Sequence, residues 1–211
     1  ERAELGFFLK TAGNYAKSKI KKIKFIKDED ILNGNLYNLL KNDFKTDILI
    51  SYGPSVIIPN KILNLVKLYK WNVHGGLSPW YRGTATLFWP TYLLEPEFTG
   101  ITLHEMTEIP DGGNIIHQTN LKIRAQDGIH ENACRATKEF SDGISKLLEN
   151  KLKKDKKING IKQQMSGRNW TEKMWNPFTL KLIYELFDDK INEYCIKNKK
   201  IKYPKLKSIL I

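Results

Sequence analysis

An amide and an imidazole lie two residues apart in this chain, directly before a pair of glycines: Asn72 and His74 precede Gly75 and Gly76. An apolar stretch over residues 63–71 leads into them. If a strand continues through these positions, both side chains leave on the same face, and the glycines let the backbone turn closely around a bound group. A hydrogen-bond donor beside a titratable ring suits a reaction that develops charge and moves a proton. A buried histidine and a capping asparagine at an ordinary turn are the alternative interpretation.

Three further side chains could extend such a site. Asp111 lies between a proline and two glycines, where aspartate commonly forms turns, and for Asp111 alone the turn interpretation is favoured. His104 and His117 have apolar neighbours in expected strands, which favours structural histidines over ligands. A zinc site formed by His74, His104 and His117 stays open, although strand spacing gives it no specific support. The sequence holds no phosphate-binding motif of the Walker or dinucleotide type.

The composition fits one α/β domain with a small appendage, since the chain has 211 residues and 41% of them are hydrophobic. No apolar run approaches the length that spans a membrane, and no signal-peptide pattern is present. The two cysteines, Cys134 and Cys195, lie in separate amphipathic stretches without metal or redox spacing. We therefore expect free thiols in a reduced, cytoplasmic protein.

The net charge of +12 raises the question of a polyanionic partner. Of the 35 basic residues only five are arginine, and lysines concentrate at 151–157 and 197–207. This distribution favours a solvated basic surface over a dedicated nucleic-acid patch. A small substrate that carries phosphate is compatible with it.

Helical and extended patterns alternate along the chain. Such alternation argues for a Rossmann-like open, mostly parallel sheet flanked by helices, with its ligand at the carboxyl ends of the strands. Because the first element is a helix, we expect a first strand upstream of Glu1. We expect a catalytic core over 1–153 and a small, mostly helical extension over 154–211. Expected helices cover 3–18, 28–40, 59–65, 84–94 (interrupted late by Pro90), 129–153 and 176–198, and expected strands cover 23–26, 46–52, a segment ending at Asn72, 100–106 and 115–118.

Four motifs then occur in order: Asn72-Val73-His74, Leu-Ser-Pro-Trp-Tyr-Arg-Gly at 77–83, Gly-Ile-Thr-Leu-His at 100–104, and Asp-Gly-Gly-Asn-Ile-Ile-His-Gln at 111–118. Together they closely resemble the formyltransferases that use 10-formyltetrahydrofolate, over roughly residues 20–150. The resemblance implies the formyltransferase fold and an enzyme that transfers a one-carbon formyl group from 10-formyltetrahydrofolate without a metal.

The resemblance also implies a catalytic trio of Asn72, His74 and Asp111. An amine would attack the formyl carbon and create a tetrahedral intermediate with an oxyanion. Asn72 and a protonated His74 would donate hydrogen bonds to that oxygen. Asp111 would favour the imidazolium, orient the ring and could help to take the proton that the amine loses.

Binding residues follow from the same resemblance. Trp80, Tyr81 and Arg82 are expected to contact the acceptor. The folate pocket is expected to be lined by Tyr52, Gly53, Pro54, Ser55, Val56, Ile57, Ile58 and Ile109.

Three acceptors are known in the family: glycinamide ribonucleotide, the aminoacyl group of initiator tRNA, and amino groups of nucleotide-linked sugars. The short extension counts against tRNA, and Gly75-Gly76 stand where the purine-pathway enzymes usually have Pro-Ser. The aromatic-rich segments 78–83 and 87–90 look more like sugar N-formyltransferases. We therefore expect a nucleotide-linked aminosugar, with dTDP as the favoured nucleotide, in glycan biosynthesis.

Other interpretations stay open. They are a glycinamide ribonucleotide or methionyl-tRNA formyltransferase, a non-catalytic member that binds folate or a nucleotide, and a basic nucleic-acid-binding module. Nucleic acid and membrane are not expected as partners, and a homodimer is compatible with the sequence.

Overall fold

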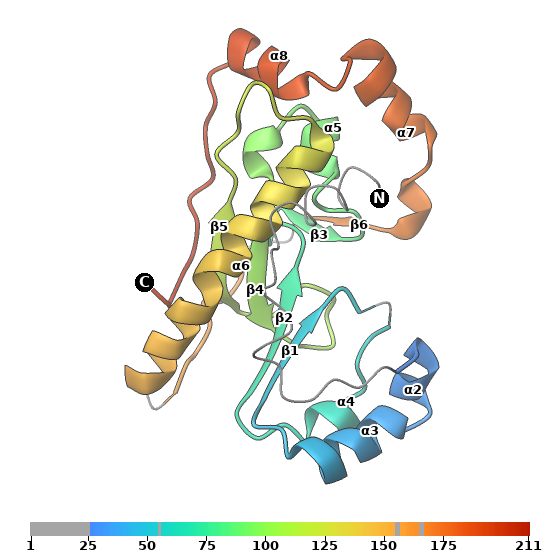
Figure 1. Cartoon of the computed structure of the whole chain (residues 1–211), viewed down its shortest axis with the longest axis vertical. Coiled ribbons are helices and arrows are strands. Elements are labelled where there is room, and N and C mark those ends of the chain that lie inside the picture. Colours follow the sequence, from blue (N-terminus) through green and yellow to red (C-terminus); the bar gives the residue numbers. More distant parts are fainter. Residues whose placement is uncertain (1–25, 55, 155–156, 165–166) are drawn as a thin grey trace, which may run out of the picture.

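The computed structural model describes residues 26–54, 56–154, 157–164 and 167–211 (Figure 1). The expected helix over 3–18 and most of the strand over 23–26 lie outside these residues. Within the described residues, four strands form the main sheet in the order β1-β2-β4-β5. Expected strands are confirmed as β1 (Ile48–Tyr52), β4 (Gly100–Glu105) and β5 (Ile115–Asn120), and β2 (Tyr69–His74) extends past Asn72.

The sheet is open but mixed, whereas a mostly parallel sheet was expected. β1 runs parallel to β2, while the pairs β2/β4 and β4/β5 are antiparallel. The connection over residues 106–114 returns the chain directly beside β4, and so short a connection permits only an antiparallel pair. Alternating helical and extended patterns reveal the elements but not the direction in which each strand enters the sheet.

The long helix α6, Ile129–Lys154, lies across the sheet (Figure 1). Its Phe140 and Leu148 pack with Trp71, Ile101 and Leu103 of the strands in the main core. Burial of side chains of this size contributes about 1.5–3 kcal/mol each, so helix and sheet stabilise one another. The expected helix over 129–153 is confirmed.

Two expected helices in the first half are shorter than their sequence patterns. A helix from 28 to 40 divides into α2 (Asp28–Leu32) and α3 (Asn35–Leu39), because Gly34 between them has a φ of 98° that an α-helix cannot contain. Between 84 and 94 only α5, Trp89–Tyr92, is helical, since Pro90 occupies its first turn instead of interrupting it late. The helix expected over 59–65 is confirmed as α4, Asn60–Leu63. The other short elements of this half are η2 (Leu40–Phe44) and η3 (Pro96–Phe98).

The chain after α6 contains more extended backbone than the mostly helical extension expected. β6, Arg168–Trp170, pairs in parallel with β3, Tyr81–Gly83. Ile161 and Ser208 form isolated bridges to residues of β5, and the C-terminal stretch runs from α8 along that strand (Figure 1). These contacts cover the edge of the sheet. The domain boundary at 153/154 stays a prediction.

The amphipathic helix expected over 176–198 is broken. Asp188 and Asp189 have φ values of 50° and 53°, in the left-handed region that a right-handed helix excludes. The helical pieces on either side, with the turn that precedes them, are η4 (Glu172–Met174), α7 (Phe178–Lys181), η5 (Leu182–Leu186) and α8 (Ile191–Asn198).

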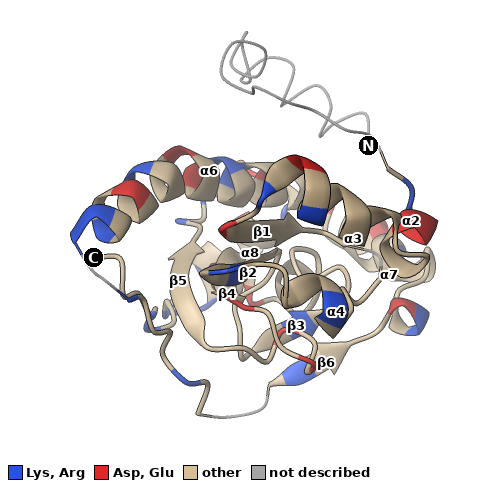
Figure 2. Ribbon diagram, turned by 90° about the horizontal axis from the view of Figure 1, so that it is seen from below, with Lys and Arg blue, Asp and Glu red and all other residues tan. Residues whose placement is uncertain are grey.

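Lysines on the long helices are interleaved with acidic residues (Figure 2). Lys138–Asp142 and Lys153–Glu149 on α6 are ion pairs one helical turn apart, and Lys197–Glu193 on α8 is another. Such exposed pairs contribute little to stability, because solvent screens their charges. Within the described residues, no helix is both long enough and apolar enough to cross a bilayer.

Candidate active site

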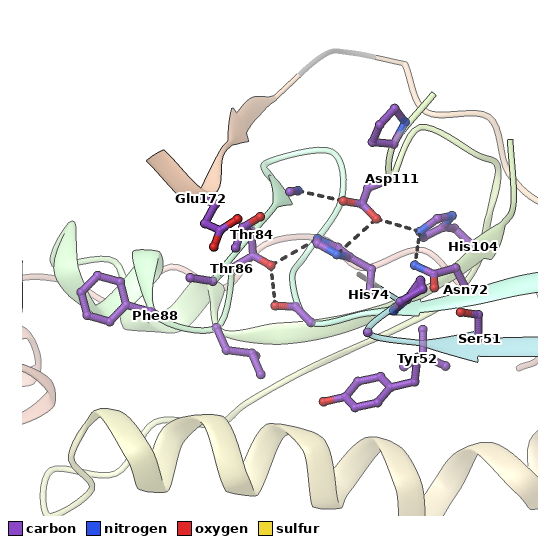
Figure 3. A pocket seen from close by; sticks show the side chains of 18 of the residues that line it. Ser51, Tyr52, Asn72, His74, Thr84, Thr86, Phe88, His104, Asp111 and Glu172 are labelled. Carbon is purple, nitrogen blue, oxygen red and sulfur yellow. Dashed lines mark hydrogen bonds and ion pairs between the residues drawn. The ribbon is translucent and has the colours of Figure 1, made fainter. Parts of the chain in front are cut away.

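The end of β2 presents Asn72 and His74 on one face of the sheet, in agreement with their spacing. The antiparallel register between β2 and β4 places His104 opposite Asn72. The loop between β4 and β5 then brings Asp111 against both histidines (Figure 3). Two strands and one loop therefore supply four polar side chains to one point.

These four side chains form a continuous network. Asp111 Oδ1 lies 3.3 Å from His74 Nδ1 and 3.3 Å from His104 Nε2. Asn72 Nδ2 lies 3.3 Å from His104 Nε2. The other carboxylate oxygen, Asp111 Oδ2, accepts a hydrogen bond from the Gly83 amide at 2.8 Å. One oxygen of the carboxylate is thus fixed by a backbone amide, and the other lies between two imidazole rings.

The backbone of Asp111 is part of a turn, in addition to the contacts that its carboxylate makes in this network. Its φ of 49° is left-handed, a conformation that aspartate adopts more readily than most residues. The Gly112 amide donates to the Ile109 carbonyl at 3.1 Å across the turn. A Cβ on Gly113 would lie 1.8 Å from the Glu105 carbonyl oxygen, so this position requires glycine. The backbone of Asp111 forms the turn while its carboxylate faces the histidines.

Two opposing influences act on the protonation of His74, and the protonated imidazole expected from the sequence stays a prediction. The side chain is 6% exposed. Burial lowers the pKa of His74 below its ordinary value of 6.5, and this effect outweighs the Asp111 carboxylate and the Tyr81 carbonyl, which raise it. For Asp111, burial raises the pKa, but the hydrogen bond from His104 and the positive charge that His74 carries when protonated bring it below its ordinary value. Burial therefore opposes protonation of the His74 ring, while the neighbours of Asp111 favour its ionised form.

The second nitrogen of His74 fixes the tautomer. His74 Nε2 lies 2.8 Å from the Tyr81 carbonyl oxygen, and because a carbonyl only accepts, Nε2 carries the hydrogen. Nδ1, beside Asp111, is then the nitrogen that gains or loses a proton. Thr86 Oγ1 lies 3.4 Å from the same Nε2 and donates to the Gly75 carbonyl at 2.7 Å, which ties the ring to the following loop.

An open cleft of about 1360 Å³ adjoins the network, and Asn72, His74, His104 and Asp111 all line it. Ser55 lies outside the described residues. Three of the apolar side chains at the cleft, Tyr52, Ile57 and Ile109, are 62%, 67% and 63% exposed, and exposed apolar surface at a cleft suits a flat ligand. All the other residues expected to line a folate pocket line this cleft: Tyr52, Gly53, Pro54, Val56, Ile57, Ile58 and Ile109.

The cleft is also lined by residues to which the sequence analysis assigned no binding role. Most of them come from α6 and the chain after it, so no local motif near Asn72 and His74 marks them. They are residues 84–88, Ile129, His130, Ala133, Cys134 and Thr137 on α6, and Glu172, Trp175 and Leu180.

The residues expected to contact the acceptor do not line the cleft. Trp80 and Tyr81 instead belong to an aromatic cluster with Trp89 and Trp170, and the Tyr81 hydroxyl donates to Glu95 at 2.6 Å. The aromatic residues of this motif therefore stabilise the fold around β3 and β6. The Arg82 Nε atom is buried and has no hydrogen-bond partner among the described residues.

A zinc site of three histidines is not assembled. Within the described part of the chain, no three His, Cys, Asp or Glu residues are grouped to hold a metal ion. His117 instead contacts Ser208 Oγ at 2.8 Å and Thr119 Oγ1 at 3.2 Å. Cys134 and Cys195 are buried free thiols, as expected.

Sequence comparison gives two findings. The family model described as formyl transferase matches residues 20–148. The methionyl-tRNA formyltransferase of Prochlorococcus marinus (strain MIT 9515) is 34% identical over 116 residues, which cover 55% of this chain and 34% of that protein. This chain therefore spans about a third of the length of that relative.

Two solved structures share the fold. The formyltransferase PseJ from Anoxybacillus kamchatkensis, in complex with UDP-4,6-dideoxy-4-formamido-L-AltNAc and tetrahydrofolate, aligns with a TM-score of 0.54 and 23% identity over 77% of this chain and 91% of that one. An N-formyltransferase from Helicobacter canadensis, in complex with folinic acid and dTDP-3-aminofucose, aligns with a TM-score of 0.50 and 21% identity over 82% of this chain and 68% of that one.

Proposed function

We propose that this chain, which belongs to the formyl transferase family, moves a formyl group from 10-formyltetrahydrofolate to an amino group. The observation that carries the proposal is the meeting of Asn72, His74 and Asp111 at a cleft with an exposed apolar wall. That wall suits the flat ring system of a folate. The tetrahydrofolate and folinic acid bound to the two similar structures support the same co-substrate.

The carbon–nitrogen bond forms when the amine lone pair attacks the formyl carbon, whose oxygen takes up the displaced electron pair. Collapse of this intermediate expels the folate nitrogen, which finally takes up the proton that the amine loses, and leaves a formamide. Asn72 is suited to stabilise the oxyanion, because preorganised amide donors act most strongly where charge develops. The donor is Nδ2, which has two hydrogens and, within the described part of the chain, one contact, with His104 Nε2. Oδ1 is buried without a hydrogen-bond partner among the described residues, so it can accept a hydrogen bond from the attacking amine.

The proton that the amine loses goes to His74 in this proposal. Nδ1 of the neutral ring is free to accept it, and the adjacent Asp111 carboxylate stabilises the imidazolium that results. The ring thereby becomes cationic while the oxyanion forms. His104 contacts both Asn72 and Asp111, and we assign it the role of holding these two side chains in register.

We propose a nucleotide-linked aminosugar as the acceptor. The sugar nucleotides bound to the Anoxybacillus and Helicobacter structures support this class. We assign the phosphates to Arg82, a cation next to Gly83, which lines the cleft although Arg82 itself does not. The wall formed by Glu172, Trp175 and Leu180 would then contact the sugar or the base.

Methionyl-tRNA is the second candidate acceptor, because the Prochlorococcus relative acts on it by name and shares 34% identity. An acceptor panel separates the two. The chain would be incubated with 10-formyltetrahydrofolate and either dTDP-3-amino, dTDP-4-amino or UDP-4-amino sugars, glycinamide ribonucleotide or methionyl-tRNA, and formamide products would be identified by mass spectrometry. Formylation of a sugar nucleotide, absent with the Asn72→Ala variant, is the expected result. Formylation of methionyl-tRNA alone would overturn the acceptor, and no formamide in any reaction would overturn the activity.

A further inference from the structure

The turn that carries Asp111 is covered by a segment that follows α6 and lies beyond the residues matched to the family. Ile161 forms two backbone hydrogen bonds with Ile115 at the start of β5, both 2.8 Å long. Next to it, the Gly160 amide donates to Glu105 Oε1 at 3.2 Å. The space is tight, since a Cβ on Gly160 would lie 2.6 Å from the Asn114 Cβ. The segment over 160–163 is therefore fixed against the base of the Asp111 turn.

Gln163 at the end of this segment connects to the turn itself. Its Nε2 donates to the Asp111 carbonyl at 2.8 Å and to the Gly113 carbonyl at 2.7 Å. An amide nitrogen has two hydrogens, so both are used on this one turn. Gln163 Oε1 is buried and has no hydrogen-bond partner among the described residues. Both side-chain donors of Gln163 therefore bind the backbone carbonyls on either side of Gly112.

That backbone needs outside support. Asp111 has a left-handed φ of 49°, and such a conformation persists in a non-glycine residue only when its surroundings determine it. The contacts of Asp111 Oδ1 with His74 and His104 are both 3.3 Å, near the upper limit for a hydrogen bond. A small rotation of the turn would break them. We propose that Gln163 is a positioning residue, which holds the Asp111 turn so that its carboxylate faces His74 and His104.

The effect on rate rests on the proposed function, but the geometry can be tested without it. His74 is faced by Asp111, His104 and Arg82 and by the Tyr81 carbonyl. Of these groups, the Asp111 carboxylate is the one that Gln163 holds. If the carboxylate moves away, the His74 imidazolium loses its stabilising charge and the His74 pKa falls.

The test compares Gln163→Met, which keeps the length of the side chain but removes its donors, with Gln163→Glu, which places oxygen where the nitrogen donates. Gln164→Met is the matched control, because Gln164 is the adjacent glutamine and is exposed. NMR titration of the His74 ring, turnover and thermal unfolding would be measured for all three. Both Gln163 variants should titrate His74 at lower pH than wild type and lose about tenfold to a hundredfold in kcat, since small misplacements cost that much. KM for the folate should change little, and the control should match wild type.

Normal His74 titration in folded Gln163 variants would overturn the proposal, as would an equal effect in Gln164→Met. Failure of both Gln163 variants to fold would also overturn it, because Gln163 would then serve the whole fold. Should wild type formylate no acceptor, the proposed function would fail, while the His74 titration would still decide the role of Gln163.

Discussion

His74 Nδ1 and Asp111 Oδ1 lie 3.3 Å apart, although the ring belongs to the end of β2 and the carboxylate to the loop between β4 and β5. The ring is buried, which lowers its pKa, while the carboxylate opposes that shift. The protonation of a histidine in this balance depends on small changes in its surroundings, which suits it to take a proton that an amine releases. The pair therefore combines a base with the charge that stabilises its protonated form.

Replacement of His74 by asparagine should reduce turnover by about a hundredfold to a thousandfold, the loss typical of one group that stabilises the transition state. Asparagine removes the titratable nitrogen but leaves a polar side chain toward the Tyr81 carbonyl. Initial rates under saturating substrates measure the effect, with circular dichroism to establish that the variant folds. Activity within threefold of wild type would remove His74 from the mechanism.

Asp111→Asn tests the charge of the carboxylate separately from the turn. Asparagine tolerates the left-handed backbone, and its remaining oxygen can still accept from the Gly83 amide, so the melting temperature should change little. Loss of the charge lowers the His74 pKa further. The rate at neutral pH should fall by at least about tenfold, and the acidic limb of the pH–rate profile should move to lower pH. A normal rate with an unchanged profile would restrict Asp111 to the turn.

The pair Asn72 and His74 could be predicted because their spacing and the glycines that follow form a local pattern. His104 could not, because alternation shows only that it belongs to a strand with apolar neighbours. Its function depends on the register that places it opposite Asn72, and register between distant strands is not a local property. For Asp111, the neighbouring proline and glycines predict the turn, but they say nothing about the direction in which the carboxylate points.

Tyr81 shows why residues near a motif can be misassigned. Its ring is parallel to that of Trp170, with centroids 6.5 Å apart, and β6, which contains Trp170, comes from the chain after α6. Sequence alone cannot show that this distant tryptophan arrives there. An aromatic residue near the loop that follows His74 can therefore pack in a core where the sequence predicts a ligand contact.

Thr102→Val should destabilise the fold through the loop that follows His74. Thr102 is fully buried, and its Oγ1 donates to the Gly76 carbonyl at 2.7 Å and accepts from the Ser78 amide at 3.0 Å and from Gln118 Nε2 at 3.2 Å. Valine has nearly the same shape but leaves these buried groups unsatisfied, at a cost of about 2–4 kcal/mol. Urea unfolding measures the loss.

Thr102→Ser provides the matched control, because it keeps the hydroxyl and removes only a methyl group, worth about 0.8 kcal/mol. Equal destabilisation by serine and valine would show that the methyl group, not the hydroxyl, matters at this position.

The two cysteines should differ in reactivity although both are free and buried. Cys134 lines the cleft, whereas burial raises the pKa of Cys195 and so disfavours its thiolate. A maleimide should therefore label Cys134 first in the native protein, and both thiols should react in denaturant. Peptide mapping assigns the labelled residue. Cys134→Ser and Cys195→Ser should retain turnover, and a large loss in either would contradict the absence of a catalytic thiol.

Stability should fall on the acidic side of neutrality because burial lowers the pKa of two histidines. Burial lowers the pKa of His117 below 6.5, and the pKa of His74 is lowered as well. Between each folded-state pKa and about 6.5, the unfolded chain binds more protons than the native one, so acidification favours unfolding. Each histidine contributes a slope of at most about 1.4 kcal/mol per pH unit in that window.

His117→Gln separates the two contributions. Glutamine can replace the contacts of the ring with Ser208 and Thr119 but does not titrate, so the variant should lose less stability than wild type as the pH falls from 7 to 5. Its kcat at neutral pH should be unchanged, because His117 does not line the cleft. Thermal unfolding of wild type, His117→Gln and the double variant with His74→Asn should give successively weaker dependence on pH. Parallel curves for all three would show that neither histidine resists protonation in the native state.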